Sequence, residues 1–250
     1  MPSVTQRISM IKQPRGGYLN PRDFQVIQLE SKADLAELES INAGLVGSVV
    51  DYMTRFMLGT RAEEAFLVSM MGAGKIGQES QCAKLISKIK GLDDESLNAA
   101  AMVVGYDVCF RVGPTGYQPV ETIVLDRSTR YNIKAMIERS LDFFKQYGPI
   151  VVDGFTFEGG YTKMVSSGDG DFLTADTLWD FKVLTKDPTN KHTLQLLMYY
   201  IMEQHSKHAF FKPIKKLGIF NPRLNKVYLY EIAKVLATVI SEIEKDVICY

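Results

Sequence analysis

Four charged residues within one short segment carry the clearest chemical signal in this sequence: Asp169, Asp171, Asp180 and Lys182. We interpret residues 174–177, which separate the two pairs, as a four-residue hairpin loop, a common length. In that register Asp171 lies opposite Asp180, and Asp169 lies opposite Lys182. Because side chains alternate between the two faces of a strand, all four are predicted to project from one face of the same hairpin.

The same register turns apolar residues to the other face of the hairpin. It places Leu173 opposite Leu178, and it directs Phe172, Trp179 and Phe181 into a core. Because this apolar alternation is typical of paired strands, the charged residues are expected to lie on regular strands.

Two directly opposed carboxylates on a sheet repel each other, and a fold tolerates them when a cation lies between them. Oxygen ligands combined with waters suit Mg²⁺ or Mn²⁺. A lysine two residues beyond one acid can orient or deprotonate a water, or balance the charge of a phosphate. This combination is the apparatus of metal-assisted phosphodiester hydrolysis. The alternative is a solvated hairpin face that carries a salt bridge, which is common where one face of a hairpin is exposed.

The predicted helix that follows the hairpin carries a second polar pair. Gln195 and Tyr199 are four residues apart, so their side chains share one helix face. Both can form hydrogen bonds to a phosphate or to a metal ligand. The alternative is a half-buried glutamine on a helix that otherwise packs in the core.

Helical periodicity dominates up to residue 148, and strands and helices alternate after the stop signal Gly148-Pro149. Helices are predicted over residues 41–58, 61–71, 79–90, 94–107, 129–146, 192–204 and 232–243. Strands are predicted over residues 150–157, 170–173, 178–183, 216–220 and 227–232. We therefore expect an α/β fold of the α+β type, with a mixed central sheet and flanking helices.

The chain length of 250 residues is compatible with one large domain. We expect residues 1–250 to form a single domain with three portions. These are an irregular arm (1–33), a mainly helical portion (34–148) and a core that carries the charged hairpin (149–250).

Residues 150–232 resemble the PD-(D/E)XK nuclease superfamily, in particular its RecB-like exonuclease branch. The order and spacing of the elements agree with that family's core sheet and flanking helices, over about a third of the chain. The matching pieces are Gly170-Asp171, Leu178-Trp-Asp-Phe-Lys182, Gln195-x-x-x-Tyr199 and the strand pair 217–220 and 227–230.

The resemblance implies a role for each matching residue. Asp171 would be the first metal-binding acid, and Asp180 would be the second, where the family accepts Asp or Glu. The backbone carbonyl of Phe181 would be a further metal ligand, and Lys182 would be the catalytic lysine. The glutamine and tyrosine of the following helix would match the motif that supports DNA and the active-site geometry in the RecB-like branch.

The family often supplies one more acid or a histidine from an upstream helix. Asp51, which follows a small-residue turn on an otherwise apolar helix, is the best candidate here, and Glu63, Glu64 and Glu138 compete with it. The family usually has a hydrophobic residue before the first acid, but this chain has a glycine there, with Asp169 as an extra acid before it. Asp169 is therefore a further candidate metal ligand.

Charge and composition restrict the class of protein. The 29 basic and 29 acidic residues cancel, which excludes a polycation, so nucleic-acid binding would need a local basic surface. Residues 186–226 offer one, with Asp187 and Glu203 as the only acids, although an ordinary solvated face is the alternative. The eight basic residues there are Lys186, Lys191, Lys207, Lys212, Lys215, Lys216, Arg223 and Lys226.

Other features limit the cofactors and the compartment. The three cysteines are far apart, which argues against a disulfide framework, a zinc ribbon or an iron–sulfur cluster. With no signal peptide and no membrane-length apolar run, the sequence predicts a cytoplasmic protein without membrane association. A protein partner or a homo-oligomer is a further possibility, because a chain with a net charge of zero attracts DNA weakly by itself.

Together these features predict a Mg²⁺- or Mn²⁺-dependent deoxyribonuclease. The resemblance to the RecB-like branch implies an exonuclease. The alternative is a catalytically silent module of the same fold that binds nucleic acid or a protein partner.

Overall fold

The computed structural model describes residues 2–31, 33–208 and 213–250. The chain forms two compact units, one of Met1–Glu30 with Phe144–Tyr250 and one of Ser31–Phe143. We call them the sheet unit and the helical unit. The helical unit corresponds closely to the predicted helical portion 34–148, and the predicted core joins the N-terminal segment.

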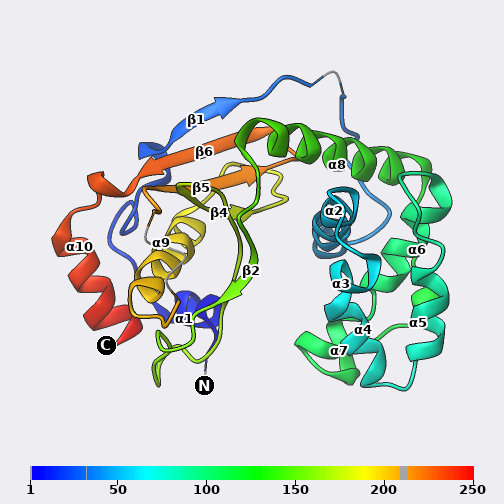
Figure 1. Ribbon diagram of the computed structural model, residues 1–250, viewed down its shortest axis with the longest axis horizontal. Coiled ribbons are helices and arrows are strands. Elements are labelled where there is room, and N and C mark those ends of the chain that lie inside the picture. The colour runs from blue at the N-terminus through cyan, green and yellow to red at the C-terminus, as the bar shows by residue number, and fades with distance from the viewer. Residues whose placement is uncertain (1, 32, 209–212) are drawn as a thin grey trace. The chain divides into compact units, whose positions relative to one another are not determined.

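The sheet unit is built on six strands in the order β1-β6-β5-β4-β3-β2 (Figure 1). Only β4 and β5 pair in parallel, and every other pairing among these strands is antiparallel. This mixed sheet with flanking helices confirms the predicted α/β class. The strands are β1 (Gln25–Gln28), β2 (Val152–Thr156), β3 (Asp169–Leu173), β4 (Thr177–Phe181), β5 (Lys216–Asn221) and β6 (Lys226–Glu231).

Helix α9 (Asn190–Gln204) connects the parallel strands β4 and β5 and packs on one face of the sheet (Figure 1). Its buried face, which includes Leu194 and Met198, joins Leu173, Leu178 and Ile219 of the strands in one apolar core. The other described helical segments of this unit are α1 (Val4–Met10), η1 (Pro21–Asp23), η4 (Ile232–Lys234), α10 (Ala237–Glu242) and the π-helix η5 (Ile243–Ile248).

Aromatic rings pack on the opposite face of the hairpin. Phe172 and Trp179 stack with their ring centroids 6.1 Å apart, and both are buried. Phe144 and Tyr147, at the end of α8 (Arg127–Tyr147), pack against them at 4.9 and 5.5 Å. β4 is therefore buried on both faces, as strands in parallel pairs usually are.

The N-terminal segment is more ordered than the predicted irregular arm. It contains α1 and β1, and β1 pairs with β6 in a register that puts Gln25 opposite Leu229. A four-residue strand with mostly exposed side chains has little apolar periodicity, so its own residues do not reveal it. Helix α1 had a visible signal in the capping box of Ser3 and Gln6.

The helical unit contains the predicted helices, with some of them split. Its buried side chains include Val49, Met53, Phe66, Leu97 and Met136. Among the described residues of the chain, no helix combines the length and the apolar character needed to cross a membrane. Its segments are α2 (Ala43–Met57), α3 (Ala62–Ala65), α4 (Leu67–Gly74), α5 (Glu79–Ile86), α6 (Asp94–Val104), α7 (Asp107–Arg111), η2 (Pro114–Gly116), η3 (Val120–Thr122) and most of α8.

Candidate active site

The candidate site lies where β4 ends and α9 begins to return over the sheet. A helix that connects two parallel strands runs antiparallel to both, so its first turns lie above the C-terminal end of the first strand. Asp180 is the next-to-last residue of β4, and Lys182 directly follows the strand. The topology therefore brings the first half of α9 toward these two residues.

Asp180 and Lys182 form the central ion pair. Lys182 Nζ lies 2.9 Å from Asp180 Oδ1, and the side chains are 25% and 2% exposed. Asp180 Oδ2 is buried and has no hydrogen-bond partner among the described residues. Buried carboxylate oxygens normally have partners, so this oxygen is an acceptor that could take a further ligand. The burial of Asp180 also argues against the alternative of a solvated hairpin face.

Asp171 is held against the same strand end. Its carboxylate Oδ2 accepts the backbone N–H of Phe181 at 2.6 Å. The ladder of β3 and β4 confirms the predicted register of Leu173 opposite Leu178, and it extends to Phe172 opposite Trp179. Beyond this ladder, the backbone N–H of Phe181 donates to the Asp171 carboxylate instead of to a backbone carbonyl of β3.

The predicted pairings of Asp171 opposite Asp180 and of Asp169 opposite Lys182 are not part of the β3–β4 ladder, which ends at Phe172 opposite Trp179. On its other edge, β3 places Asp169 opposite Thr156 of β2, and the Lys182 backbone N–H donates to the Phe220 carbonyl of β5 at 3.0 Å. Asp169 is exposed but still acts electrostatically on Lys182.

The carboxylates dominate the electrostatics around the lysine. Burial lowers the pKa of Lys182, but the charges of Asp180, Asp171 and Asp169 outweigh it and raise that pKa above its ordinary value. All three acids therefore lie close enough to favour the charged ammonium. The lysine is accordingly a cation and a hydrogen-bond donor at neutral pH.

Gln195 and Tyr199 interact directly on α9. Gln195 Nε2 donates to the Tyr199 hydroxyl at 2.8 Å, which confirms that the two side chains share a helix face. Burial and the charges of Asp180, Asp171 and Asp169 raise the pKa of Tyr199 well above its usual range. The phenol thus keeps its proton, and the same three acids that surround the lysine also surround this ring.

His192, on the first turn of α9, is a further candidate site residue that the sequence analysis did not single out. Its Nδ1 accepts the backbone N–H of Thr189 at 2.9 Å, so Nε2 carries the hydrogen of the neutral ring. Burial lowers the pKa of His192, Asp180 raises it, and Lys182 lowers it again, with a net lowering. The ring therefore lies within electrostatic reach of both members of the ion pair. The available signal was its position on the first turn of the helix, three residues before Gln195.

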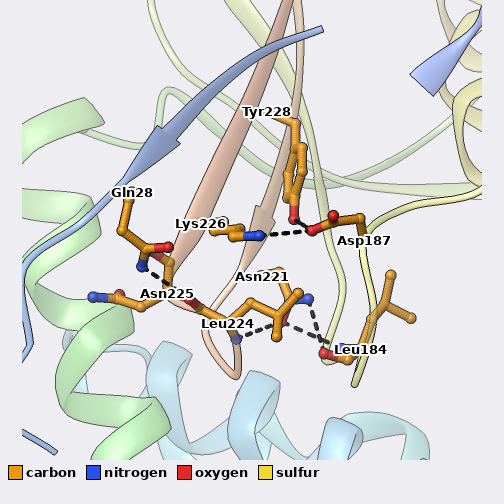
Figure 2. A network of polar contacts seen from close by, with 8 residues as sticks. All are labelled: Gln28, Leu184, Asp187, Asn221, Leu224, Asn225, Lys226 and Tyr228. Carbon is orange, nitrogen blue, oxygen red and sulfur yellow. Dashed lines mark hydrogen bonds and ion pairs between the residues drawn. The ribbon is translucent and has the colours of Figure 1, made fainter. Parts of the chain in front are cut away.

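The loop that leaves the site is fixed to the neighbouring strands. The buried Asn221 side chain donates to the Leu184 carbonyl at 2.9 Å, and its oxygen accepts the Leu184 N–H at 3.3 Å (Figure 2). Asp187 accepts the Tyr228 hydroxyl at 2.6 Å and pairs with Lys226 at 2.9 Å. These contacts hold the loop that follows Lys182 against β5 and β6.

Gly170, the residue before the first acid, has a structural reason to be glycine. It lies opposite Phe155 of β2, and a Cβ atom at this position would be 2.1 Å from the Phe155 ring. The phenyl ring of the neighbouring strand thus occupies the space that a side chain at position 170 would need.

We expect Gly170→Ala to lower the free energy of unfolding by about 1–3 kcal/mol, because the new methyl group overpacks the ring. Urea denaturation checks this. The double variant with Phe155→Leu should be less destabilised than the sum of the two single variants, since the ring that clashes is gone. Strictly additive losses would contradict the proposed clash.

Of the remaining predicted residues, one belongs to the helical unit and two of the basic residues form ion pairs. Asp51, the tentative upstream acid, lies on α2 in the helical unit and forms an ion pair with Arg55 at 2.9 Å. In the predicted basic surface, Lys216 pairs with Asp176 at 2.9 Å, and Lys226 is bound as described above. Lys212 lies outside the described residues.

The arrangement can be tested for its fit to a divalent cation. Within residues 2–31, 33–208 and 213–250, no group of three or more His, Cys, Asp or Glu side chains could hold a metal ion. Two carboxylates with one backbone carbonyl would need waters to complete a shell, which is the usual way that Mg²⁺ binds. The unpartnered Oδ2 of Asp180 and the Asp171 carboxylate, whose Oδ2 accepts the Phe181 N–H at 2.6 Å, are the side-chain oxygens that could contribute to such a ligand set.

No protein-family model, curated protein or solved structure matches this chain.

Proposed function

We propose that the protein is a metal-dependent nuclease that hydrolyses phosphodiester bonds of DNA, with a core of the PD-(D/E)XK type. The observation that carries the proposal is the buried carboxylate of Asp180. One of its oxygens holds Lys182 at 2.9 Å, and the other has no partner among the described residues. A structural ion pair has no need to leave a buried carboxylate oxygen without a partner.

The chain's own residues would perform distinct tasks. The Lys182 ammonium has three hydrogens, and only one of them is needed for Asp180, so another can orient a water or bind a phosphate oxygen. Gln195 holds the Tyr199 hydroxyl, and that hydroxyl keeps a hydrogen to donate near the acids. Cations and hydrogen-bond donors aimed at a phosphate stabilise the charge that develops during its hydrolysis.

Asp171, Asp180 and the Phe181 carbonyl would hold Mg²⁺ or Mn²⁺. When bound, the cation lowers the pKa of a coordinated water and polarises the phosphate. The reaction adds water across one P–O bond: the water oxygen bonds to phosphorus, and the departing sugar oxygen takes up a proton from solvent.

The second candidate function is a silent module of the same fold that binds nucleic acid or a protein partner. The nuclease proposal is favoured because the silent module gives no reason to retain the buried acid beside two others.

The test is a cleavage assay of the wild type and Asp171→Asn with labelled DNA. Single-stranded, linear duplex and circular DNA are each incubated with Mg²⁺, Mn²⁺ or EDTA. We expect the wild type to cleave only with metal and Asp171→Asn to lose at least about 10²-fold in rate, because a metal ligand is weakened. The preferred substrate also separates an exonuclease from an endonuclease.

Glu231→Gln is the matched control, because it removes one exposed carboxylate of the same unit, outside the candidate site. It should cleave like the wild type. If the wild type cleaves none of the substrates with either metal, the nuclease proposal fails and the binding module takes its place. Equal cleavage by Asp171→Asn would remove that residue from the metal site.

A further inference from the structure

A groove on the sheet unit has no role in the chemistry described so far. Its volume is about 940 Å³, and the N-terminal segment forms one of its walls. Loop 182–189 and the start of α9 contribute Asp187 and Asn190, and β6 contributes Tyr228. Arg15 and Arg22 are the basic residues that line it.

The groove has a net positive character. Both arginine side chains are exposed, and in the described part of the chain neither guanidinium has a hydrogen bond or an ion pair. Asp187 is the acid that lines the groove, and its charge is balanced by Lys226 at 2.9 Å and by a hydrogen bond from Tyr228 (Figure 2). The groove is therefore lined by two guanidinium groups without a paired carboxylate, and its one lining carboxylate is already bound to Lys226 and Tyr228. Such groups bind phosphates well, often with two parallel hydrogen bonds.

The wall that carries the arginines is attached to α9. The buried Thr193 hydroxyl donates to the Leu19 carbonyl at 2.6 Å. Gly17 has a φ of +89°, and a Cβ atom there would lie 2.6 Å from the Asn190 Cβ. The close approach and the positive φ both require glycine, and they fix the segment between the two arginines against the first turn of the helix.

The groove and the candidate active site therefore share one element. Asn190, the first residue of α9, lines the groove. His192, two residues later, interacts electrostatically with Asp180 and Lys182. A chain of phosphates that occupies the groove would pass the first turn of α9 to reach the acids.

We propose that this groove binds the sugar–phosphate backbone of the nucleic-acid strand that is cut, with Arg15 and Arg22 as its phosphate contacts. The inference rests on the proposed function, which it deepens by assigning a path for the substrate. Backbone contacts of this kind position a strand without reading its sequence, so the groove should show no base preference.

The test measures binding without cleavage. Fluorescence anisotropy of a labelled single-stranded oligonucleotide is recorded in EDTA for the wild type and for Arg15→Ala/Arg22→Ala, across a series of salt concentrations. We expect the dissociation constant of the double variant to rise about tenfold or more at low salt. The slope of log K against log salt should fall by about 1.4, because two phosphate contacts are lost. Duplex DNA and RNA of the same sequence show which kind of strand the groove prefers.

Lys163→Ala/Lys245→Ala is the matched control, since it removes two exposed charges of the same unit that lie outside the groove and have no ion pair among the described residues. Its salt slope should stay close to that of the wild type. An arginine variant that binds with wild-type affinity and slope overturns the inference, as does a wild type that binds none of the nucleic acids. An equal fall in slope for both double variants also overturns it, because only net charge would then matter.

The two proposals fail in different ways. If the wild type does not cleave but the arginine variant binds more weakly with a reduced slope, the groove is a nucleic-acid site without the proposed nuclease activity, and only the nuclease proposal is contradicted. If the wild type cleaves with metal and the arginine variant binds normally, the nuclease proposal stands and the groove assignment falls.

Discussion

We expect Lys182→Met to lower the rate of Mg²⁺-dependent DNA cleavage by about 10³-fold. Methionine keeps most of the aliphatic stem and removes the ammonium group. The lost group is the cation that Asp180 holds at 2.9 Å and that three acids keep charged. Without it, no described side chain on the β4 end supplies a positive charge to the attacking water or the phosphate.

The same substitution should also destabilise the fold, which affects how the assay is designed. In Lys182→Met both oxygens of the buried Asp180 carboxylate would lack a partner. Breaking a buried ion pair from one side costs about 3–5 kcal/mol. Cleavage therefore has to be measured on protein shown to be folded by circular dichroism and urea denaturation, at a temperature well below the transition.

Two further variants separate the lost chemistry from the lost stability. Lys182→Arg keeps the charge but changes the donor geometry, so it should fold well and retain part of the activity. Lys182→Met/Asp180→Asn removes both charges, which should recover stability but not cleavage. Cleavage by folded Lys182→Met within tenfold of the wild type would show that the lysine has no catalytic role.

The hairpin could be predicted because its signal is local. Alternation of apolar and charged residues over a dozen positions is enough to set Leu173 opposite Leu178, and the structure has that register. The helix pair was predictable for the same reason, since a spacing of four residues defines a helix face. Gln195 and Tyr199 meet at 2.8 Å as that rule requires.

The contacts that complete the site connect residues far apart in the sequence. The backbone amide of Lys182 pairs with Phe220, and Asn221 holds Leu184, because β5 lies parallel to β4. No local pattern specifies which strand will be the neighbour, so these contacts could not be predicted from the sequence of the hairpin.

Burial was the other property that the sequence could not supply. From the sequence, a charged residue on a strand with one apolar face is expected to be exposed to solvent. Asp180 is instead almost completely buried, because α9 packs on β4. The N-terminal segment shows the same limitation. The pairing of β1 with β6 spans about 200 residues of sequence, and short polar strands acquire their structure from such partners.

Replacing Glu203 with glutamine should stabilise the protein at pH 8 by about 3 kcal/mol. Glu203 lies on α9, one turn beyond Tyr199, and is 5% exposed. Burial raises its pKa to about 7, and the hydrogen bond from Gln204 only partly opposes this. A buried carboxyl with a raised pKa is easy to keep neutral but costly to ionise.

The sign of the pH dependence follows from proton linkage. An unfolded glutamate titrates near pH 4.5, whereas the folded Glu203 keeps its proton up to a pH of about 7. Between these values the folded state binds more protons, so the contribution of this group to stability falls as the pH rises. It is fully present below about pH 4 and is lost above about pH 7. Glu203→Gln cannot ionise, so the difference in stability from the wild type should grow across that window and then level off.

Urea denaturation followed by tryptophan fluorescence measures this difference directly. Trp179 is the single tryptophan of the chain and lies on β4, so its emission reports the unfolding of the sheet unit that contains Glu203. The matched control is Glu231→Gln, an exposed position of the same unit, whose stability should follow the wild type at every pH. Equal stability of Glu203→Gln and the wild type at pH 5 and at pH 8 would contradict the raised pKa. A smaller free energy of unfolding for Glu203→Gln at pH 8 would show that the carboxylate is ionised and stabilised by a partner. In either case α9 would not impose the desolvation on which this prediction depends.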